Sequence, residues 1–314
     1  MAKFWHLEEI IMKRTDINIR DPYVLVDNGK YYIYGTRSST CWGLAEGFDV
    51  YVSDDLEEFE GPIEIFKRSD DFFANSSFWA PECYKIGDRY YLVTTLGSDS
   101  GWKKGIFLMV SDNPTGPFEL YSEKLTPENW TCIDGTLWLE DDRAYLIYSH
   151  SFEDVLDPSC ADASYDGEYV MQELSADMNQ AVSAPAVILK ARDFAWARPF
   201  PYAREEFGVE GDVYFSDGPC FMKMSDGRLY MISSTWSKAG YAVGVASSEN
   251  GIHGPWTLQE HPLYPENGGH GMFFKDKNGD TIFTLHYPND KYKEHPVFYR
   301  IELRDGQLIL GQQI

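Results

Sequence analysis

The 314-residue sequence has few cysteines and few basic residues, and each shortage excludes a class of protein. Five cysteines with no CxxC pair cannot form a complete disulfide framework, so we expect buried, reduced thiols. There are 27 Lys and Arg against 50 Asp and Glu, which gives a net charge of −23. Such a charge repels a nucleic acid backbone or an anionic lipid surface. We therefore expect neither nucleic acid nor a membrane as a partner.

Long apolar stretches are also missing. Lys3, His6, Glu8 and Glu9 interrupt residues 1–14, which therefore lack the apolar core of a secretion signal. No segment approaches the roughly 18 apolar residues that a membrane-spanning helix needs. The expected location is cytoplasmic.

Aromatic residues, in contrast, are abundant. They make up 16% of the chain, with 21 Tyr, 19 Phe and 9 Trp, and such residues favour strands. The longer apolar runs show no helical periodicity, which predicts an all-β protein with little helix. A chain of this length can form one large all-β domain.

One unit occurs five times along the sequence. Its first copy starts at Arg20-Asp21-Pro22-Tyr23, continues as an apolar strand to the turn Asp27-Asn28-Gly29-Lys30, and ends in a second strand. The other copies start near residues 80, 134, 217 and 270, and each copy is followed by a third apolar run and often by a fourth. Three or four strands repeated five times predict a five-bladed β-propeller, formed as a single domain over residues 1–314.

Two segments depart from this spacing. Residues 149–215, between the third and fourth units, are longer than needed and rich in proline and aromatic residues. We expect part of this segment to pack as a loop over one mouth of the propeller. The first 19 residues are weakly patterned, and we expect them to add an outer strand that helps to close the ring.

The alignment of the five units places titratable residues at the head of most first strands. Counting back ten residues from the second strand gives Asp21, Ala80 and Asp134, and the longer turns of the last two units bring Asp217 and His270 into the same position. First strands line the channel of a propeller, so these residues would form one ring. A single Asp before Pro or Gly is usually a turn former. Three like charges near one axis raise each other's pKa, and this is tolerated mainly where chemistry uses it.

Such a ring suits glycoside hydrolysis. In that reaction one carboxylate activates water while a second carboxyl group, kept protonated, donates to the leaving oxygen. A third carboxylate can orient the acid and raise its pKa. Inverting enzymes hold the pair roughly 6.5–9.5 Å apart and retaining enzymes roughly 5–5.5 Å apart, so a retaining propeller glycosidase is an alternative. A neutral oligosaccharide also fits the acidic composition of the chain.

Four short motifs together resemble glycoside hydrolase family 43: Arg-Asp-Pro at 20–22, Trp-Ala-Pro-Glu at 79–82, Ile-Asp-Gly at 133–135 and Gly-His-Gly at 269–271. The resemblance covers nearly the whole chain in the same order. It implies a five-bladed propeller that hydrolyses glycosides with inversion. The implied substrates are α-L-arabinofuranosides or β-D-xylosides, and in some members galactosides or galactofuranosides.

The resemblance also implies roles for the aspartates. Asp21 would be the general base, and Asp134 would orient the general acid and modulate its pKa. The family has Glu at the acid position, where this chain has Asp217, which is shorter by roughly 1.5 Å. Three outcomes follow: Asp217 acts as the acid with its backbone moved inward, Glu168 or Glu210 supplies the proton, or the propeller binds sugar without catalysis.

Further residues are predicted at the same mouth. His270 could give one ligand to a cation such as Ca²⁺ in the channel, although no cofactor is required, and calcium would take its other ligands from oxygen. His286 is expected to face the mouth and contact the substrate. Flat rings bury the C–H faces of sugars, and the candidates for this stacking are Trp79, Trp42, Phe78, Trp196 and Trp236. An aromatic loop that blocks one end of the cleft would favour exo action on oligosaccharides.

Overall fold

The first hairpin forms as its sequence predicts. Asp27 pairs with Lys30 across a two-residue turn, in which Asn28 and Gly29 have φ angles of 49° and 74°. This left-handed conformation at both turn positions matches the twist of the flanking strands. Those strands are β2 (Ile19–Asp27) and β3 (Lys30–Arg37). The computed structural model describes residues 11–314. The first two strands of each of its five sheets form such a hairpin, with longer turns at residues 224–228 and 276–280.

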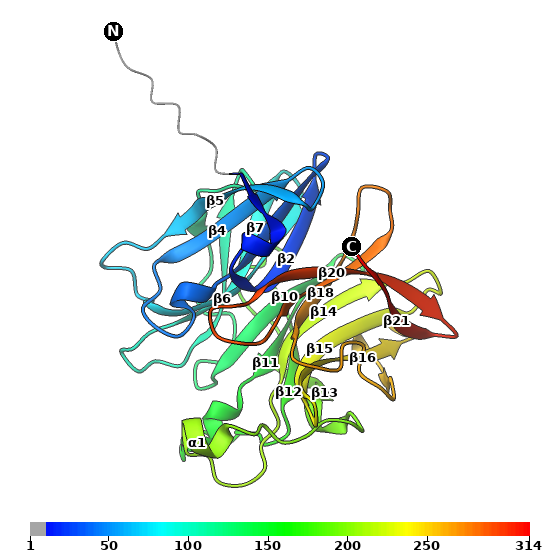
Figure 1. Ribbon diagram of the computed structural model, residues 1–314. Helices are drawn as coiled ribbons and strands as arrows, with labels where there is room; N and C mark the ends of the chain where they lie inside the picture. Colours follow the sequence, from blue (N-terminus) through cyan, green and yellow to red (C-terminus); the bar gives the residue numbers. More distant parts are fainter. Residues whose placement is uncertain (1–10) are drawn as a thin grey trace.

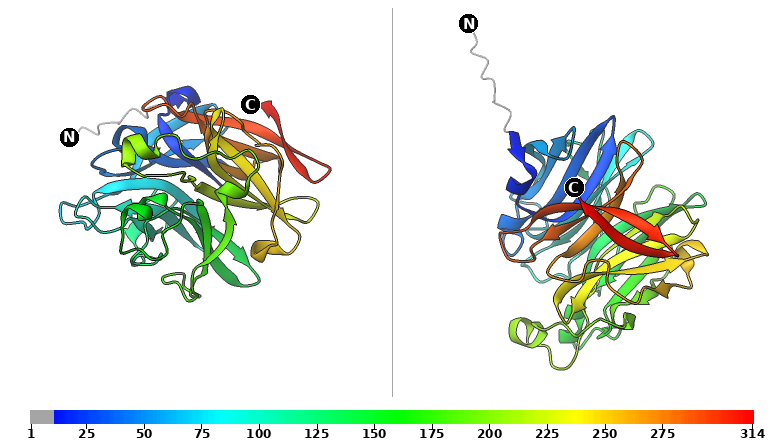
Figure 2. Two further views of the ribbon diagram at one scale, coloured as in Figure 1. Left: turned by 90° about the horizontal axis from the view of Figure 1, so that it is seen from below. Right: turned by 45° about the vertical axis from the view of Figure 1, so that its right-hand side comes forward.

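The five antiparallel sheets surround a common axis, which confirms the predicted five-bladed propeller (Figures 1 and 2). Blade one continues with β4 (Gly47–Ser53) and β5 (Glu58–Lys67) and gains β1 (Ile11–Lys13) outside β5. The other blades contain β6 (Ser76–Ile86), β7 (Arg89–Gly97), β8 (Gly105–Ser111) and β9 (Glu119–Leu120); β10 (Cys132–Glu140), β11 (Arg143–His150), β12 (Glu168–Glu173) and β13 (Ala186–Lys190); β14 (Asp217–Lys223), β15 (Leu229–Ser237), β16 (Gly240–Ser248) and β17 (Thr257–Leu258); and β18 (Gly269–Lys275), β19 (Thr281–Tyr287), β20 (His295–Arg304) and β21 (Gln307–Gln313).

Apolar side chains fill the spaces between neighbouring blades. Phe48 of blade one stacks on Phe78 of blade two with ring centroids 5.4 Å apart, and similar clusters separate the following blades. The first strands β2, β6, β10, β14 and β18 pack against one another around the axis. Their leading residues are therefore brought together at one end of the channel.

The ring closes between blades five and one without a shared strand. β1 pairs with β5 inside blade one, and the last strand, β21, pairs with β20 inside blade five. Side chains hold this seam: Arg20 lies 2.7 Å from the fully buried Glu294, which also accepts a hydrogen bond from Ser38 at 2.8 Å. The expected outer strand is present, but it does not close the ring. The remainder of the predicted segment, residues 1–10, lies outside the described residues.

Helix is scarce, as predicted. The single α-helix among residues 11–314 is α1 (Ala203–Phe207), in the long segment between blades three and four, and it lies at one end of the propeller (Figure 1). Short 3₁₀ turns occupy Arg14–Asp16, Ser38–Thr40, Phe152–Leu156, Ala191–Asp193 and Gly251–His253. Within the described part of the chain no helix has the length and apolarity to span a bilayer. All five cysteines are free and buried, as expected.

Candidate active site

Each first strand carries a bulge near its start, where its pairing with the second strand shifts. The first bulge residue has a positive φ in every blade: Asp21 53°, Ala80 45°, Asp134 58°, Gly218 49° and His270 47°. A residue other than glycine held in this conformation costs on the order of 1–3 kcal/mol, and it persists only where its surroundings impose it. The same turn thus recurs at five points around the axis.

Blade four corrects the predicted alignment. Its bulge residue is Gly218, whereas Asp217 occupies the preceding position and pairs with Ser234, as Arg20 pairs with Thr36 in blade one. Counting from the second strand missed this because the bulge, rather than the length of the turn, sets the register. A Cβ at Gly218 would come within 2.9 Å of the His270 ring, so glycine is the residue that fits there.

Side chains of the preceding blade hold the bulge at four of the five junctions. Each accepts a hydrogen bond from the backbone N–H of a bulge residue: Thr36 from Ala80 at 2.7 Å, Thr95 from Asp134 at 2.9 Å, Ser234 from His270 at 2.8 Å, and Nδ1 of His286 from Asp21 at 3.2 Å. These hydrogen bonds hold the strained backbone in place, which explains why the positive φ angles persist.

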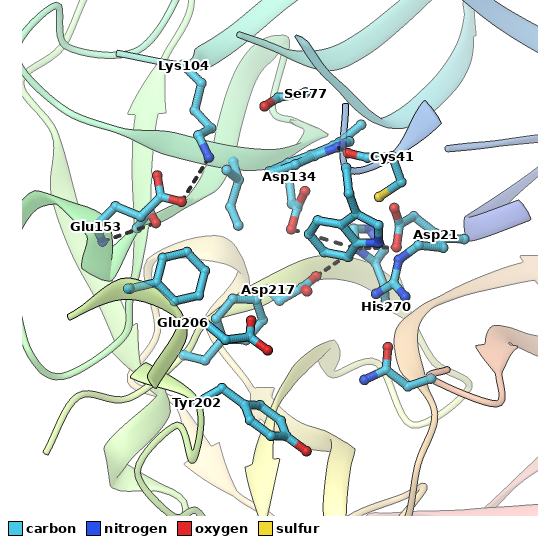
Figure 3. Close-up of a pocket in the computed structure, with 18 of the residues that line it drawn as sticks. Asp21, Cys41, Ser77, Lys104, Asp134, Glu153, Tyr202, Glu206, Asp217 and His270 are labelled. Atoms are coloured by element: carbon cyan, nitrogen blue, oxygen red, sulfur yellow. Dashed lines mark hydrogen bonds and ion pairs between the residues drawn. The ribbon is translucent and has the colours of Figure 1, made fainter. Parts of the chain in front are cut away.

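Four titratable side chains meet at the axis (Figure 3). Nδ1 of His270 lies 2.7 Å from Oδ1 of Asp217, 3.4 Å from Oδ1 of Asp21 and 3.7 Å from Oδ2 of Asp134. All four residues are buried. The structure therefore brings together the three aspartates and the histidine that the repeat pointed to.

Hydrogen bonds fix two of these carboxyl groups. Thr36 donates from Oγ1 to Oδ2 of Asp21 at 2.6 Å, and the Tyr241 hydroxyl donates to Oδ2 of Asp217 at 2.5 Å. Thr36 also accepts the Ala80 amide, so one side chain couples Asp21 to the next blade. The free oxygens of both aspartates then face His270.

Opposite charges decide the protonation of the cluster. Burial opposes a charge on His270, but Asp21, Asp217 and Asp134 raise the pKa of its imidazole well above the ordinary value. Burial would also raise the pKa of Asp21, yet the charge of His270, helped by Arg20, holds that pKa below its usual range. Against the same effect of burial, His270 lowers the pKa of Asp217. Burial and the charge of Asp217 raise the pKa of Asp134 well above its usual value. These pKa shifts favour the charged forms of Asp21, Asp217 and His270 and the neutral form of Asp134.

Three of the axial residues are placed as metal ligands would be. Carboxylate oxygens of Asp134 and Asp217 and a ring nitrogen of His270 lie within 4.8 Å of one another. Calcium prefers six to eight oxygen ligands, so water would have to supply most of its coordination here. Nδ1 of His270 also lies 2.7 Å from Oδ1 of Asp217. A cation held by His270 in the channel stays a prediction.

A cavity of about 760 Å³ opens over the cluster, a volume within the range of small-molecule sites. Its lining includes all four axial residues. Aromatic side chains form much of its wall: Trp42, Trp79, Phe152, Phe200, Tyr202, Phe207, Phe215, Trp236 and Tyr241. Several belong to the long segment between blades three and four, which therefore lies at the mouth as predicted. Rings in such a wall can bury the apolar faces of a sugar.

Three of the five aromatic residues predicted for stacking line this cavity. Trp79 and Trp42 stand edge to face at 5.9 Å, and Trp236 lies on another part of the wall. Phe78 was predicted wrongly, because it is buried against Phe48 between two blades. Trp196 was also predicted wrongly, because it packs on Phe194 in the core between blades three and four.

Three other predicted residues lie away from the cavity. His286 is fully buried, and burial with the nearby charge of Arg20 lowers its pKa, so a neutral ring holds the Asp21 amide instead of contacting sugar. Glu168 lies 3.5 Å from Lys190 and 3.6 Å from His150, and the exposed Glu210 lies 3.6 Å from Arg204. Neither glutamate lines the cavity, so neither is placed to be the alternative acid.

The sequence did not single out several charged residues of the wall, among them Lys104, Glu153 and Glu206. Lys104 lies 2.9 Å from Glu153, and Glu206 projects from α1 (Figure 3). The aromatic composition of residues 149–215 pointed to this wall. No pattern in Ala203–Phe207 indicates which of its two glutamates faces inward.

A five-bladed propeller with buried carboxyl groups at one mouth is an architecture of glycoside hydrolases. The model of glycosyl hydrolases family 43 matches residues 16–308, so the chain belongs to this family of inverting glycosidases. Among solved structures, an endo-arabinase from Bacteroides thetaiotaomicron VPI-5482 is similar with a TM-score of 0.82 and 31% identity, over 94% of this chain and 98% of that chain.

Similar characterised proteins include the "Alpha-L-arabinofuranosidase 43" of Humicola insolens, 21% identical over 94% of this chain. Another is the "Xylosidase/arabinosidase" of Thermoclostridium stercorarium, 25% identical over 85% of this chain. The chain spans 61% and 57% of the length of these two enzymes.

Proposed function

We propose that the protein hydrolyses α-L-arabinofuranosyl linkages with inversion and releases sugar from the ends of oligosaccharides. The observation that carries this proposal is the ionised, buried Asp21 in a cavity lined by aromatic rings. The likeness to an endo-arabinase and an arabinofuranosidase supports the choice of sugar. β-D-Xylosyl linkages are the second choice, supported by the xylosidase/arabinosidase.

In this mechanism Asp21 is the general base. Its Oδ2 is held by Thr36, while Oδ1 stays free to take a proton from a water that attacks the anomeric carbon. The reacting sugar acquires positive charge in the transition state, and the fixed carboxylates of Asp21 and Asp217 stabilise that charge. The charge of His270, which faces both carboxylates, offsets their mutual repulsion.

The wall of the cavity supports exo action. Residues 151–153 and the segment around α1 contribute Phe152, Tyr202 and Phe207 to one side of the cavity. A chain end can enter such a pocket, whereas an internal segment of a polymer needs a cleft that is open at both ends.

A substrate panel tests the proposal. The purified protein is given the 4-nitrophenyl glycosides of α-L-arabinofuranose, β-D-xylose, galactose and galactofuranose, and then arabino-oligosaccharides. We expect the arabinofuranoside to react fastest, single sugars to appear first from oligosaccharides, and NMR to show the β-anomer as the first product. Asp21→Asn should lower kcat by at least about 10³-fold without changing thermal unfolding.

Other results would decide against this function. A first product that retains the α-configuration would mean that the enzyme is not inverting. Early release of long oligosaccharides from linear arabinan would replace exo with endo action. Calorimetric binding of sugar without hydrolysis of any substrate would instead indicate a sugar-binding propeller, an outcome that the short Asp217 makes worth testing.

A further inference from the structure

Asp217 is poorly suited to be the proton donor. One of its oxygens accepts the Tyr241 hydroxyl at 2.5 Å, and the other lies 2.7 Å from Nδ1 of His270 as an ion pair. Oδ1 of Asp21 lies 3.4 Å from the same Nδ1, so these oxygens of Asp21 and Asp217 are at most about 6 Å apart, below the roughly 6.5–9.5 Å of inverting glycosidases. Asp217 therefore lies too close to the base, Asp21, to act as the acid. It is also paired with the positively charged His270.

Most other carboxyl groups that line the cavity also have a hydrogen-bond or ion-pair partner within the protein. Asp99 accepts a hydrogen bond from Asn75 at 2.7 Å, Glu153 pairs with Lys104 at 2.9 Å, and Asp290 pairs with Lys293 at 2.6 Å. Among residues 11–314, Glu206 is the one cavity-lining carboxyl whose side chain has neither an ion pair nor a hydrogen bond within the protein. A salt bridge would hold a carboxyl group in its charged form, so the paired carboxyl groups are poor proton donors.

The scaffold of Glu206 is well packed. Phe207 and Phe200 pack on Phe152 with ring centroids 5.2 Å and 5.4 Å away, and Ala203 is buried in the same cluster. Gly208, with a φ of 73°, ends α1 directly after this anchor. The cluster seats α1 against the wall of the cavity, so the position of Glu206 does not depend on a loose loop.

Glu206 also points into the cavity. In Figure 3 its carboxyl projects toward the open space over the axial residues, and all of them line the same cavity. Glu is longer than Asp by one methylene group, which gives a donor on the wall further reach into the cavity.

We propose that Glu206 is the general acid of this enzyme and takes the role of the carboxyl group at position 217. The assignment rests on the proposed function. Glu206 gives its proton to the glycosidic oxygen as the bond from that oxygen to the anomeric carbon breaks, and the electron pair of the bond stays with the leaving oxygen. Water forms the new bond from the opposite face and passes a proton to Asp21. One water is consumed, after which Asp21 loses a proton to solvent and Glu206 regains one.

The leaving group provides the test. An arabino-oligosaccharide needs a proton on its leaving oxygen, whereas 4-nitrophenolate departs as a stable anion. Glu206→Gln should therefore lower kcat/KM about 10²–10⁴-fold on the oligosaccharide and less than about tenfold on the 4-nitrophenyl glycoside. The matched control is Glu205→Gln. Glu205 is exposed, as Glu206 is, but it does not line the cavity, so this variant should behave like the wild type.

Two results would overturn the assignment while leaving the proposed function intact. The first is near-normal hydrolysis of the oligosaccharide by Glu206→Gln, with thermal unfolding confirming that the variant is folded. The second is the leaving-group pattern in Asp217→Asn or Asp134→Asn instead, which would return the role of acid to the axis. Wild-type protein that hydrolyses none of the panel would refute the proposed function itself, and the assignment with it.

Discussion

The Tyr241 hydroxyl donates a hydrogen bond to Oδ2 of Asp217, while Oδ1 of the same carboxylate faces His270 at 2.7 Å. Tyr241 is the second residue of β16, and Asp217 is the first residue of β14 in the same blade. Burial and the charge of Asp217 raise the pKa of Tyr241 well above its ordinary value, so the hydroxyl keeps its proton and remains a donor. This carboxylate is thus held from both sides.

Removal of that donor should affect both stability and catalysis. A hydrogen bond to a charged group contributes about 1.5–3 kcal/mol, and Tyr241→Phe should lower the free energy of unfolding by this order. We expect kcat/KM to fall about tenfold, which corresponds to about 1.4 kcal/mol. Tyr90→Phe is the control, because Tyr90 donates to Asp27 at 2.7 Å beside a hairpin turn and does not line the cavity. It should lose stability but retain activity; equal activity in the two variants would contradict the role of Tyr241.

The charge of His270 should set the acid limb of the pH profile. It lowers the pKa of Asp21, so the wild-type base stays ionised below the usual aspartate range of about 3.9. His270→Gln removes the cation that favours the carboxylate, and the pKa of Asp21 should rise. The acid limb of kcat/KM should then move up by about 1–3 pH units. His253→Gln, on the exposed surface of blade four, should leave the limb in place.

A buried carboxyl of blade two should make stability depend on pH. Burial raises the pKa of Glu82 from 4.5 to about 7, although a hydrogen bond from Tyr84 opposes this. The native state therefore keeps a proton that the unfolded state releases, and the free energy of unfolding should fall as pH rises from about 4.5 to about 7. The loss is on the order of 3 kcal/mol. Glu82→Gln should flatten this part of the stability curve in denaturant titrations, whereas the exposed Glu119→Gln should follow the wild type.

The ion pair at the seam between blades five and one should be costly to break. Glu294 is fully buried 2.7 Å from Arg20, so Glu294→Gln leaves a largely buried guanidinium without its counter-charge. Loss of one partner of a buried pair typically costs about 3–5 kcal/mol. The exposed pair of Arg228 and Glu249, at 2.8 Å, is the comparison, and Glu249→Gln should cost no more than about 1 kcal/mol. Similar costs for both variants would show that the seam does not depend on this pair.

The sequence was informative where a local signal repeated. The hairpin turn at Asn28-Gly29 and its four counterparts marked the blades, and the same spacing located Asp21, Asp134 and His270. Asp217 was assigned to the bulge position, which Gly218 occupies one residue later. The sequence gives no sign of this, because a bulge shifts the strand register without changing the residues around it. Phe78 and Trp196 were predicted to stack on sugar, but both pack between blades. The direction in which such a side chain points depends on contacts between blades, which the sequence does not reveal.

Glu206 could not have been found in this way. Its position depends on the contacts of Phe207 and Phe200 with Phe152, and Phe152 lies some fifty residues earlier in the chain. Nothing in the spacing of Ala203–Phe207 reports those contacts. The repeat pattern predicts the blades, but it does not predict how a segment outside the repeat packs against distant residues.

The hydrogen bonds to the bulge amides have a consequence for recombination. Thr36 belongs to blade one and holds Ala80 of blade two, and Thr95 of blade two in turn holds Asp134 of blade three. The unit that presents a functional residue therefore runs from the second strand of one blade to the first strand of the next. A chimaera with crossover points between whole blades would separate each residue from its support. Crossovers between the first and second strands of a blade would keep them together, so the module that evolution or a designer can exchange is offset from the visible blade.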